Sequence, residues 1–216
     1  MTKGKLEKRY TLFIISLFFS GLGVAVTKRG ELGVSPISSV ANVMSYKLPE
    51  LSLGTWLLIW NTVLLLAQIV LLRNKFQRIQ LLQLPLSVLF GWFTDLGMKL
   101  ASLLPNDVYF ERIAWVLLGV VVLAFGIALA VIANVVMNSG EAFVKAISDM
   151  TGKAFGNVKI CFDVSCVCMA IIMSLIFFDF KLVGTREGTI IAAFLTGVMV
   201  KIHLKLIKEP VDKILT

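Results

Sequence analysis

Cysteine and histidine are scarce in this sequence: 216 residues include three cysteines and one histidine. Cys161, Cys166 and Cys168 form no Cys-x-x-Cys pair, and on a helix Cys166 would point away from the other two. The sequence also lacks a nucleotide-binding glycine loop, a metal-binding His/Cys spacing and the nucleophile elbow of hydrolases. We therefore expect a protein that is not an enzyme and that holds no cofactor and no metal.

Charged residues are also few, at 16% of the chain, whereas 58% of the residues are hydrophobic. Soluble domains contain roughly 45–50% apolar residues, and the mean hydropathy here is +0.90. A soluble fold of this size would have no place for so much apolar surface, so the sequence predicts a polytopic membrane protein. The basic start MTKGKLEKRY leads directly into an apolar segment without a small-x-small cleavage site, which favours a first span over a signal peptide.

Six apolar segments are long enough to cross a bilayer. With the N-terminus inside, thirteen of the 21 lysines and arginines fall on the inner side, seven on the outer side, and Lys159 lies within a span. By the positive-inside rule both termini are expected in the cytoplasm. The net charge of +8 then sets orientation, and no nucleic-acid partner is expected. The predicted spans are residues 10–27, 52–73, 82–104, 112–136, 157–178 and 187–207.

Two gaps between spans, residues 28–51 and 137–156, are too apolar for plain loops and too short to span a membrane. Each contains a segment with helix-start residues. Ser35 is placed as an N-cap with Pro36 at the first helical position, and Ser139 is a candidate cap with Glu141 in the first turn. We predict half-helices over 36–46 and 140–150 that re-enter the membrane, with backbone N–H groups facing a polar or anionic group.

The two halves of the chain resemble each other in order and spacing. Each half contains three spans and one half-helix. Because three spans make an odd number of membrane crossings, the second copy must lie upside down, as in many secondary transporters. We expect an all-α membrane protein with six transmembrane helices in two inverted repeats, residues 1–107 and 108–216, each with a re-entrant half-helix. The matched positions are Gly23 with Gly126 (103 apart), Gly54 with Gly156 and Asn61 with Asp163 (both 102 apart), and Gly91 with Gly197 (106 apart).

Four segments also resemble a known family: GVSPISSV (33–40), FGWFTDLG (90–97), FGNVKICFDVSCV (155–167) and GTREGTIIAAFLTG (184–197). They are similar to the YczE/YyaS/YitT membrane proteins of bacteria, closest to the YczE-like branch, over nearly the whole chain. The second half-helix departs from the family, because MNSGEAF (137–143) lacks the proline that many relatives carry. The resemblance implies a bacterial plasma-membrane protein, and some relatives have been linked to export of, or resistance to, small molecules.

Ionisable and polar residues in or beside the spans form the candidate substrate or ion pathway, because charge is costly inside a bilayer. Lys159 and Asp163, four residues apart, lie on one helical face and can pair. They are either a structural pair, with Lys159 reaching the cytoplasmic surface, or a proton-carrying carboxylate tuned by its lysine. The whole candidate set is Asp163, Lys159, Glu141, Asp95, Asn61, Ser35, Pro36, Ser139 and Trp92.

Two of these candidates have structural alternatives of their own. Asp95, beside Trp92 in the third span, is either a pathway carboxylate or the partner of Lys99 near the outer surface. Glu141 lies either at the buried tip of the second half-helix or on the cytoplasmic surface, paired with Lys145.

The expected function is a secondary, proton-coupled transporter or exporter of a small solute. The alternatives are a ligand-capturing or accessory subunit of another transport protein and a passive channel. The inverted repeat favours a transporter or a channel over a capture subunit, which needs no such symmetry. The expected partners are the lipid bilayer and a small-molecule or ionic substrate, and a homo-oligomer stays open.

Overall fold

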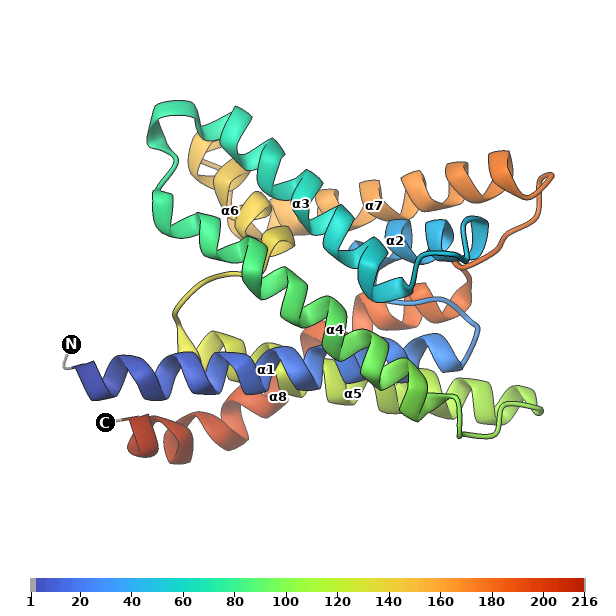
Figure 1. Cartoon of the computed structure of the whole chain (residues 1–216), viewed down its shortest axis with the longest axis horizontal. Coiled ribbons are helices and arrows are strands. Elements are labelled where there is room, and N and C mark those ends of the chain that lie inside the picture. The colour runs from blue at the N-terminus through green and yellow to red at the C-terminus, as the bar shows by residue number, and fades with distance from the viewer. Residues whose placement is uncertain (1–2, 216) are drawn as a thin grey trace.

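The computed structural model describes residues 3–215, and over that range the chain is helical, with turns and no strand (Figure 1). Six helices are long and apolar enough to cross a membrane, which confirms the six predicted segments. Two shorter helices lie in the two gaps, where half-helices were predicted. The long helices are α1 (Lys3–Arg29), α3 (Leu53–Leu72), α4 (Gln83–Ala101), α5 (Tyr109–Ala133), α7 (Phe155–Phe177) and α8 (Glu187–Leu215); the short ones are α2 (Pro36–Lys47) and α6 (Ser139–Thr151).

Helix ends follow local chemistry. Pro36 begins α2, because its fixed φ suits the first turn and its missing N–H costs no helical bond. Asn134 ends α5 and Gly152 ends α6, both in the left-handed conformation common at helix C-termini. Two 3-10 turns, Arg73–Lys75 and Arg78–Leu82, connect α3 to α4.

The long helices form two layers. In one layer α1 and α5 pack together at the centre, α4 lies against α1, and α8 lies against α5. The other layer has α3 and α7 at its sides, with α2 and α6 between them and in contact with both. The pair α3 and α4 joins the layers on one side.

Small residues hold α1 and α5 close together. A Cβ added at Gly126 would lie 2.5 Å from Ser20 Oγ, and one at Gly23 would meet the backbone of Leu123. Gly119 approaches Thr27 in the same way. Without a hydrophobic force between helices in lipid, such close approach supplies the packing that holds them together. Among the six long helices α1 and α5 are the most buried: 56% of the most apolar 18 residues of each are buried, against 6% in α8.

The two short helices meet by their N-termini in the interior. Gly140, the second residue of α6, packs on the side chain of Ile37, the second residue of α2, and a Cβ there would lie 2.9 Å from Ile37 Cδ1. From this junction α2 and α6 run toward opposite ends of the molecule (Figure 1). The second cap differs from the prediction by one position, because Asn138 occupies the cap and Ser139 is the first helical residue.

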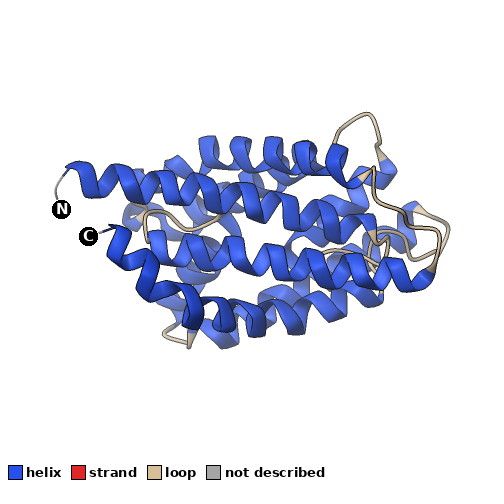
Figure 2. Cartoon of the chain, turned by 90° about the horizontal axis from the view of Figure 1, so that it is seen from below, coloured by secondary structure: helices blue, strands red, loops and turns tan. Residues whose placement is uncertain are grey.

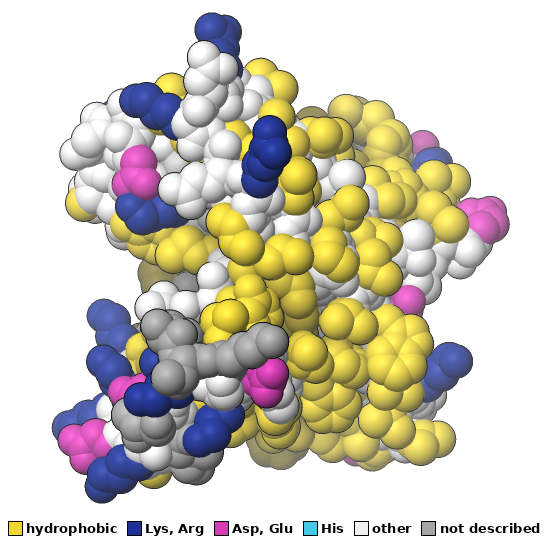
Figure 3. All heavy atoms as spheres, turned by 60° about the vertical axis from the view of Figure 1, so that its left-hand side comes forward, with side chains coloured by type: hydrophobic (Ala, Val, Ile, Leu, Met, Phe, Trp, Pro, Cys, Tyr) yellow, Lys and Arg dark blue, Asp and Glu magenta, His cyan; other side chains and the backbone are white. Residues whose placement is uncertain are grey.

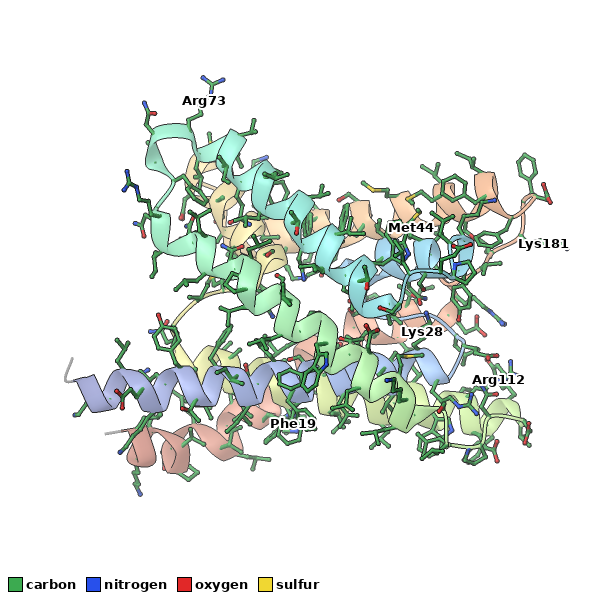
Figure 4. The ribbon with its side chains drawn as sticks, viewed as in Figure 1. Phe19, Lys28, Met44, Arg73, Arg112 and Lys181 are labelled. Carbon is green, nitrogen blue, oxygen red and sulfur yellow. The ribbon has the colours of Figure 1, made fainter. Side chains whose placement is uncertain are left out.

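Both chain ends lie at one end of the molecule (Figure 1, Figure 2). Arg73, in the connection between α3 and α4, lies at that end, whereas Arg112 and Lys181 lie at the opposite end (Figure 4). Figure 3 turns the end with the termini toward the viewer and shows Lys and Arg side chains gathered on two lobes with a hollow between them.

Candidate functional site

The short helix α2 begins with a buried proline. Pro36 is buried at the start of α2, and the hydroxyl of Ser35 donates to Ser38 Oγ at 3.0 Å instead of capping a backbone N–H. No side chain caps this helix, Pro36 has no N–H, and the Ser38 N–H donates to the Ser35 carbonyl at 3.0 Å; the first turn of α2 lies at the junction with α6, where Ile37 contacts Gly140.

The short helix α6 begins with a buried serine whose hydroxyl is unpaired. Ser139 is 2% exposed, and its Oγ has no hydrogen-bond partner among the described residues 3–215. The backbone carbonyl of Ser139 accepts a hydrogen bond of 3.1 Å from Gln68 Nε2 of α3. The Asn138 side chain does not cap α6 either, so the first turns of both helices and one unpaired hydroxyl lie at this point.

A buried glutamine pair, which the sequence reasoning missed, fixes the α6 side of this junction. Gln68 Nε2 donates to Gln83 Oε1 at 3.1 Å, and Gln83 Nε2 donates to Gln68 Oε1 at 3.2 Å. Gln68 is 0% exposed and Gln83 is 3% exposed, so the pair links α3, α4 and α6 away from solvent and lipid. The sequence signal that could have identified this contact is an amide side chain inside an apolar span, such as Gln68 within residues 53–72.

Lys159 and Asp163 form the predicted ion pair on α7. Both side chains are partly exposed, the lysine by 26% and the aspartate by 23%. Glu141 of α6 is under the electrostatic influence of both charges, and Phe143 contacts Phe162 with ring centroids 5.5 Å apart. Three predicted site residues are thus grouped where α6 meets α7, and Lys145 pairs with Asp149 instead of Glu141.

Asp95 lies elsewhere and binds the start of α3. Its carboxylate accepts hydrogen bonds from Ser52 Oγ at 2.5 Å and from the Gly54 backbone N–H at 2.8 Å. A carboxylate is favoured there by the helix macrodipole and by the unpaired N–H groups of the first turn. The predicted alternative partner of Asp95, Lys99, takes no part in these bonds. Asp95 therefore ties α4 to α3.

Trp92 is 60% exposed on α4, and Asn61 lies half-buried on α3. Trp92 and Asp95 line a cavity of about 640 Å³ between α1, α4 and the α2–α3 connection. Lys28 lines it too, and Figure 4 shows Lys28 between α1 and α2, where it donates to Ser45 Oγ at 2.7 Å.

A second cavity, of about 490 Å³, lies at the end with the termini, between Arg9 of α1, Ile132 of α5 and Lys205 of α8.

A family model described as a family of unknown function, DUF6198, matches residues 7–205. The chain belongs to the DUF6198 family. No curated protein and no solved structure matches it.

The DUF6198 match covers every predicted site residue, from Ser35 to Asp163. In this DUF6198 protein the candidates other than Asn61 fall into two groups. Ser35, Pro36 and Ser139 lie at the half-helix junction, with the Glu141–Lys159–Asp163 cluster on the same short helix α6 and its neighbour α7. Asp95 and Trp92 lie at the cavity beside the start of α3. The described residues contain no group of His, Cys, Asp and Glu arranged to hold a metal ion.

Proposed function

We propose that this protein is a secondary transporter of a small solute, with its binding site at the junction of α2 and α6 and an ion-coupling site at Asp163. The observation that carries the proposal is the meeting of two short helices by their N-termini between two long apolar helices. Half-helices that end near the membrane midplane form the substrate sites of many transporters, because their free N–H groups can bind polar groups there.

Contacts between α1 and α5 support the inverted repeat. With the 103-residue offset, the contact of Gly23 with Leu123 corresponds to a contact of Gly126 with Ser20, and both are present. The contact of Gly119 with the carbonyl of Gly23 likewise corresponds to that of Gly126 with the carbonyl of Ser16. A two-fold axis between α1 and α5 would produce such exchanged contacts.

Contacts between the other helices support the same symmetry. In the repeat, α1 to α4 correspond to α5 to α8. The contact of α1 with α4 is matched by that of α5 with α8, and the contact of α2 with α7 by that of α6 with α3. The contact of α2 with α3 is matched by that of α6 with α7. We propose that α2 and α6 re-enter the membrane, since non-helical backbone at membrane depth is tolerated where protein surrounds it.

Asp163 is proposed to carry the proton in coupled transport. It replaces the neutral Asn61 of the first repeat, and Lys159 pairs with it without sealing it from its surroundings. A carboxylate partly withdrawn from water can take up and release a proton during a transport cycle. Glu141, influenced by the same charges, connects this cluster to the first turn of α6.

The setting we propose is the plasma membrane of a bacterium, with both termini in the cytoplasm, as expected for a relative of the YczE-like proteins. Lys and Arg gather at the end with the termini, as the positive-inside rule requires of a cytoplasmic face (Figure 3). The proposed partners are lipid and a small-molecule or ionic substrate, and no enzymatic reaction is proposed.

A passive channel is the second candidate, favoured by the same junction, because paired half-helices also occur in hourglass channels. Uptake by proteoliposomes containing only this protein separates the candidates. A transporter accumulates solute against its gradient when a proton gradient is imposed, whereas a channel only equilibrates solute. A capture subunit binds solute and moves none. Uptake that is unaffected by collapse of the proton gradient would contradict the coupling assigned to Asp163.

A further inference from the structure

The two repeats differ most at one helix pair. In the first repeat α3 packs along α4, and a Cβ added at Gly91 would lie 2.6 Å from the Gly54 carbonyl oxygen. In the second repeat, α7 and α8 form no interface of comparable extent among the described residues. The matching glycines, Gly156 and Gly197, have no neighbouring atom within 4 Å of an added Cβ.

Over residues 3–215, the polar ties of the first pair also have no counterpart between α7 and α8. Both links between α3 and α4 are lost at the repeat positions in the second half. The Ser52–Asp95 hydrogen bond has Ala154 and Lys201 at the corresponding positions, and the Gln68–Gln83 pair has Ala170 and Thr189. The first pair is therefore held shut by bonds that the second pair cannot make.

The connection between α7 and α8, residues 178–186, is fixed at its own end. Asn42 of α2 donates to the Gly184 carbonyl at 2.6 Å, and the Gly188 N–H donates to the Leu32 carbonyl at 2.8 Å. Val183 N–H donates to Ser174 Oγ at 2.7 Å. Because this end is anchored, a closing movement must bring together the ends of α7 and α8 on the side of the chain termini, and α7 must then shift against α2 and α6, which it contacts.

We infer that α7 and α8 form a gate, which closes when α7 swings about the 178–186 connection and brings Gly156 against Gly197. The closed gate repeats the contact of Gly54 with Gly91. Glycine at both positions lets the two helix backbones approach closely. The closed contact thus gives a reason for Gly156 and Gly197, at which an added Cβ would meet no atom within 4 Å in the open form. The inference rests on the inverted repeat of the proposed function.

Closing this gate would cover the ion pair. Gly156 and Asp163 are seven residues apart on α7 and therefore share a helical face. The face that would turn toward α8 thus carries the Asp163 carboxylate, now partly exposed. On this inference, access to Asp163 runs between α7 and α8, and closure of the gate seals it. The ends of α7 and α8 that would approach lie on the side of the chain termini, the end of the molecule that Figure 3 turns toward the viewer.

Disulfide trapping tests the gate without any assay of transport. Ala154 and Lys201, both exposed, correspond to Ser52 and Asp95 and should meet when the gate closes. Each is replaced by cysteine in a protein whose three native cysteines are alanine, reconstituted in liposomes and oxidised with copper phenanthroline. The matched control pairs Ala154→Cys with Leu206→Cys, which is exposed on α8 and rotated by about 140° from position 201.

We expect the Ala154→Cys/Lys201→Cys pair to form an intramolecular disulfide at least tenfold faster than the control pair. Adding Gly197→Val should slow it at least tenfold, because the new side chain occupies the closed contact but meets nothing in the open form. The melting temperature should stay that of the parent, as for the equally unhindered Gly4→Val.

Equal rates for the two pairs, or no effect of Gly197→Val, would overturn the gate. A disulfide between two chains in a single-cysteine variant would also overturn it, because a second copy would then cover the α8 face. Uptake measured in the same liposomes separates the two proposals. If the disulfide forms as expected but no solute is taken up, the gate stands and the transporter proposal is refuted. If solute is taken up but the disulfide does not form as expected, the transporter proposal stands and the gate is refuted.

Discussion

The buried glutamine pair gives a quantitative test of how α3, α4 and α6 are held together. We replace Gln68 with leucine, Gln83 with leucine, and both together. Leucine is close to glutamine in size, so the changes remove hydrogen bonds while leaving little cavity. Gln68→Leu removes the bonds to Gln83 and to the Ser139 carbonyl, whereas Gln83→Leu removes only the reciprocal pair.

The expected magnitudes follow from the bonds. Hydrogen bonds between helices in membrane proteins contribute about 0.6 kcal/mol each on average and about 1.7 kcal/mol at most. A buried polar group left without a partner costs a further 1–3 kcal/mol or so. Gln68→Leu leaves the Gln83 amide and the Ser139 carbonyl unpaired, so we expect about 2–3 kcal/mol of destabilisation. Gln83→Leu should cost about 1–2 kcal/mol, because Gln68 keeps its bond to Ser139.

The double variant should cost less than the sum of the single variants, since removing both amides leaves no unpaired amide at the α3–α4 contact. We expect a coupling free energy of about 1 kcal/mol. Reversible unfolding by SDS in mixed micelles measures all four proteins, with the exposed Gln77→Leu as a control within about 0.5 kcal/mol of the parent. Additive single effects, or a Gln68→Leu protein as stable as the parent, would refute the assignment of this pair as a structural tie.

Three other predictions concern function, topology and packing. Asp163→Asn should leave insertion and melting temperature unchanged but abolish gradient-driven uptake; uptake at the parental rate would reduce the ion pair to a structural role. In intact cells, an impermeant thiol reagent should label a cysteine at Lys181 and spare one at Gln77, and the reverse pattern would invert the proposed orientation. Gly126→Ala should destabilise the protein by about 1–3 kcal/mol, because its Cβ would lie 2.6 Å from Ser20 N, while Gly4→Ala should not; equal melting temperatures for these two variants would contradict the α1–α5 packing.

Hydropathy and helix-start chemistry were sufficient to predict the elements of this fold. Each span is set by its own apolar residues, and the Ser-Pro start of α2 is a local feature, so both can be identified without a structure. The start of α6 was less distinct, because Asn138 and Ser139 are both acceptable caps; Asn138 takes the cap position, without a side-chain cap bond.

The roles of individual polar residues were harder to predict because they depend on helices far apart in the sequence. Asp95 has a lysine one turn away, yet its carboxylate binds the first turn of α3, 41 residues earlier, where backbone N–H groups lack partners. Gln68 and Gln83 carry no charge and follow no motif, so nothing marked them as a pair. Lys159 and Asp163 were predictable because both lie on one helix.

The seam between α1 and α5 has a consequence for how the protein is made. Gly23 packs on Leu123, and Arg9 donates hydrogen bonds to the carbonyls of Ile132 and Ala133, so the main partner of α1 is synthesised about one hundred residues later. At about 5–20 residues per second, α1 waits on the order of 5–20 s in the membrane with its serine and glycine face unpaired. During that time the insertion machinery or lipid must cover this face, and a ribosome stalled before α5 would leave α1 without its main partner.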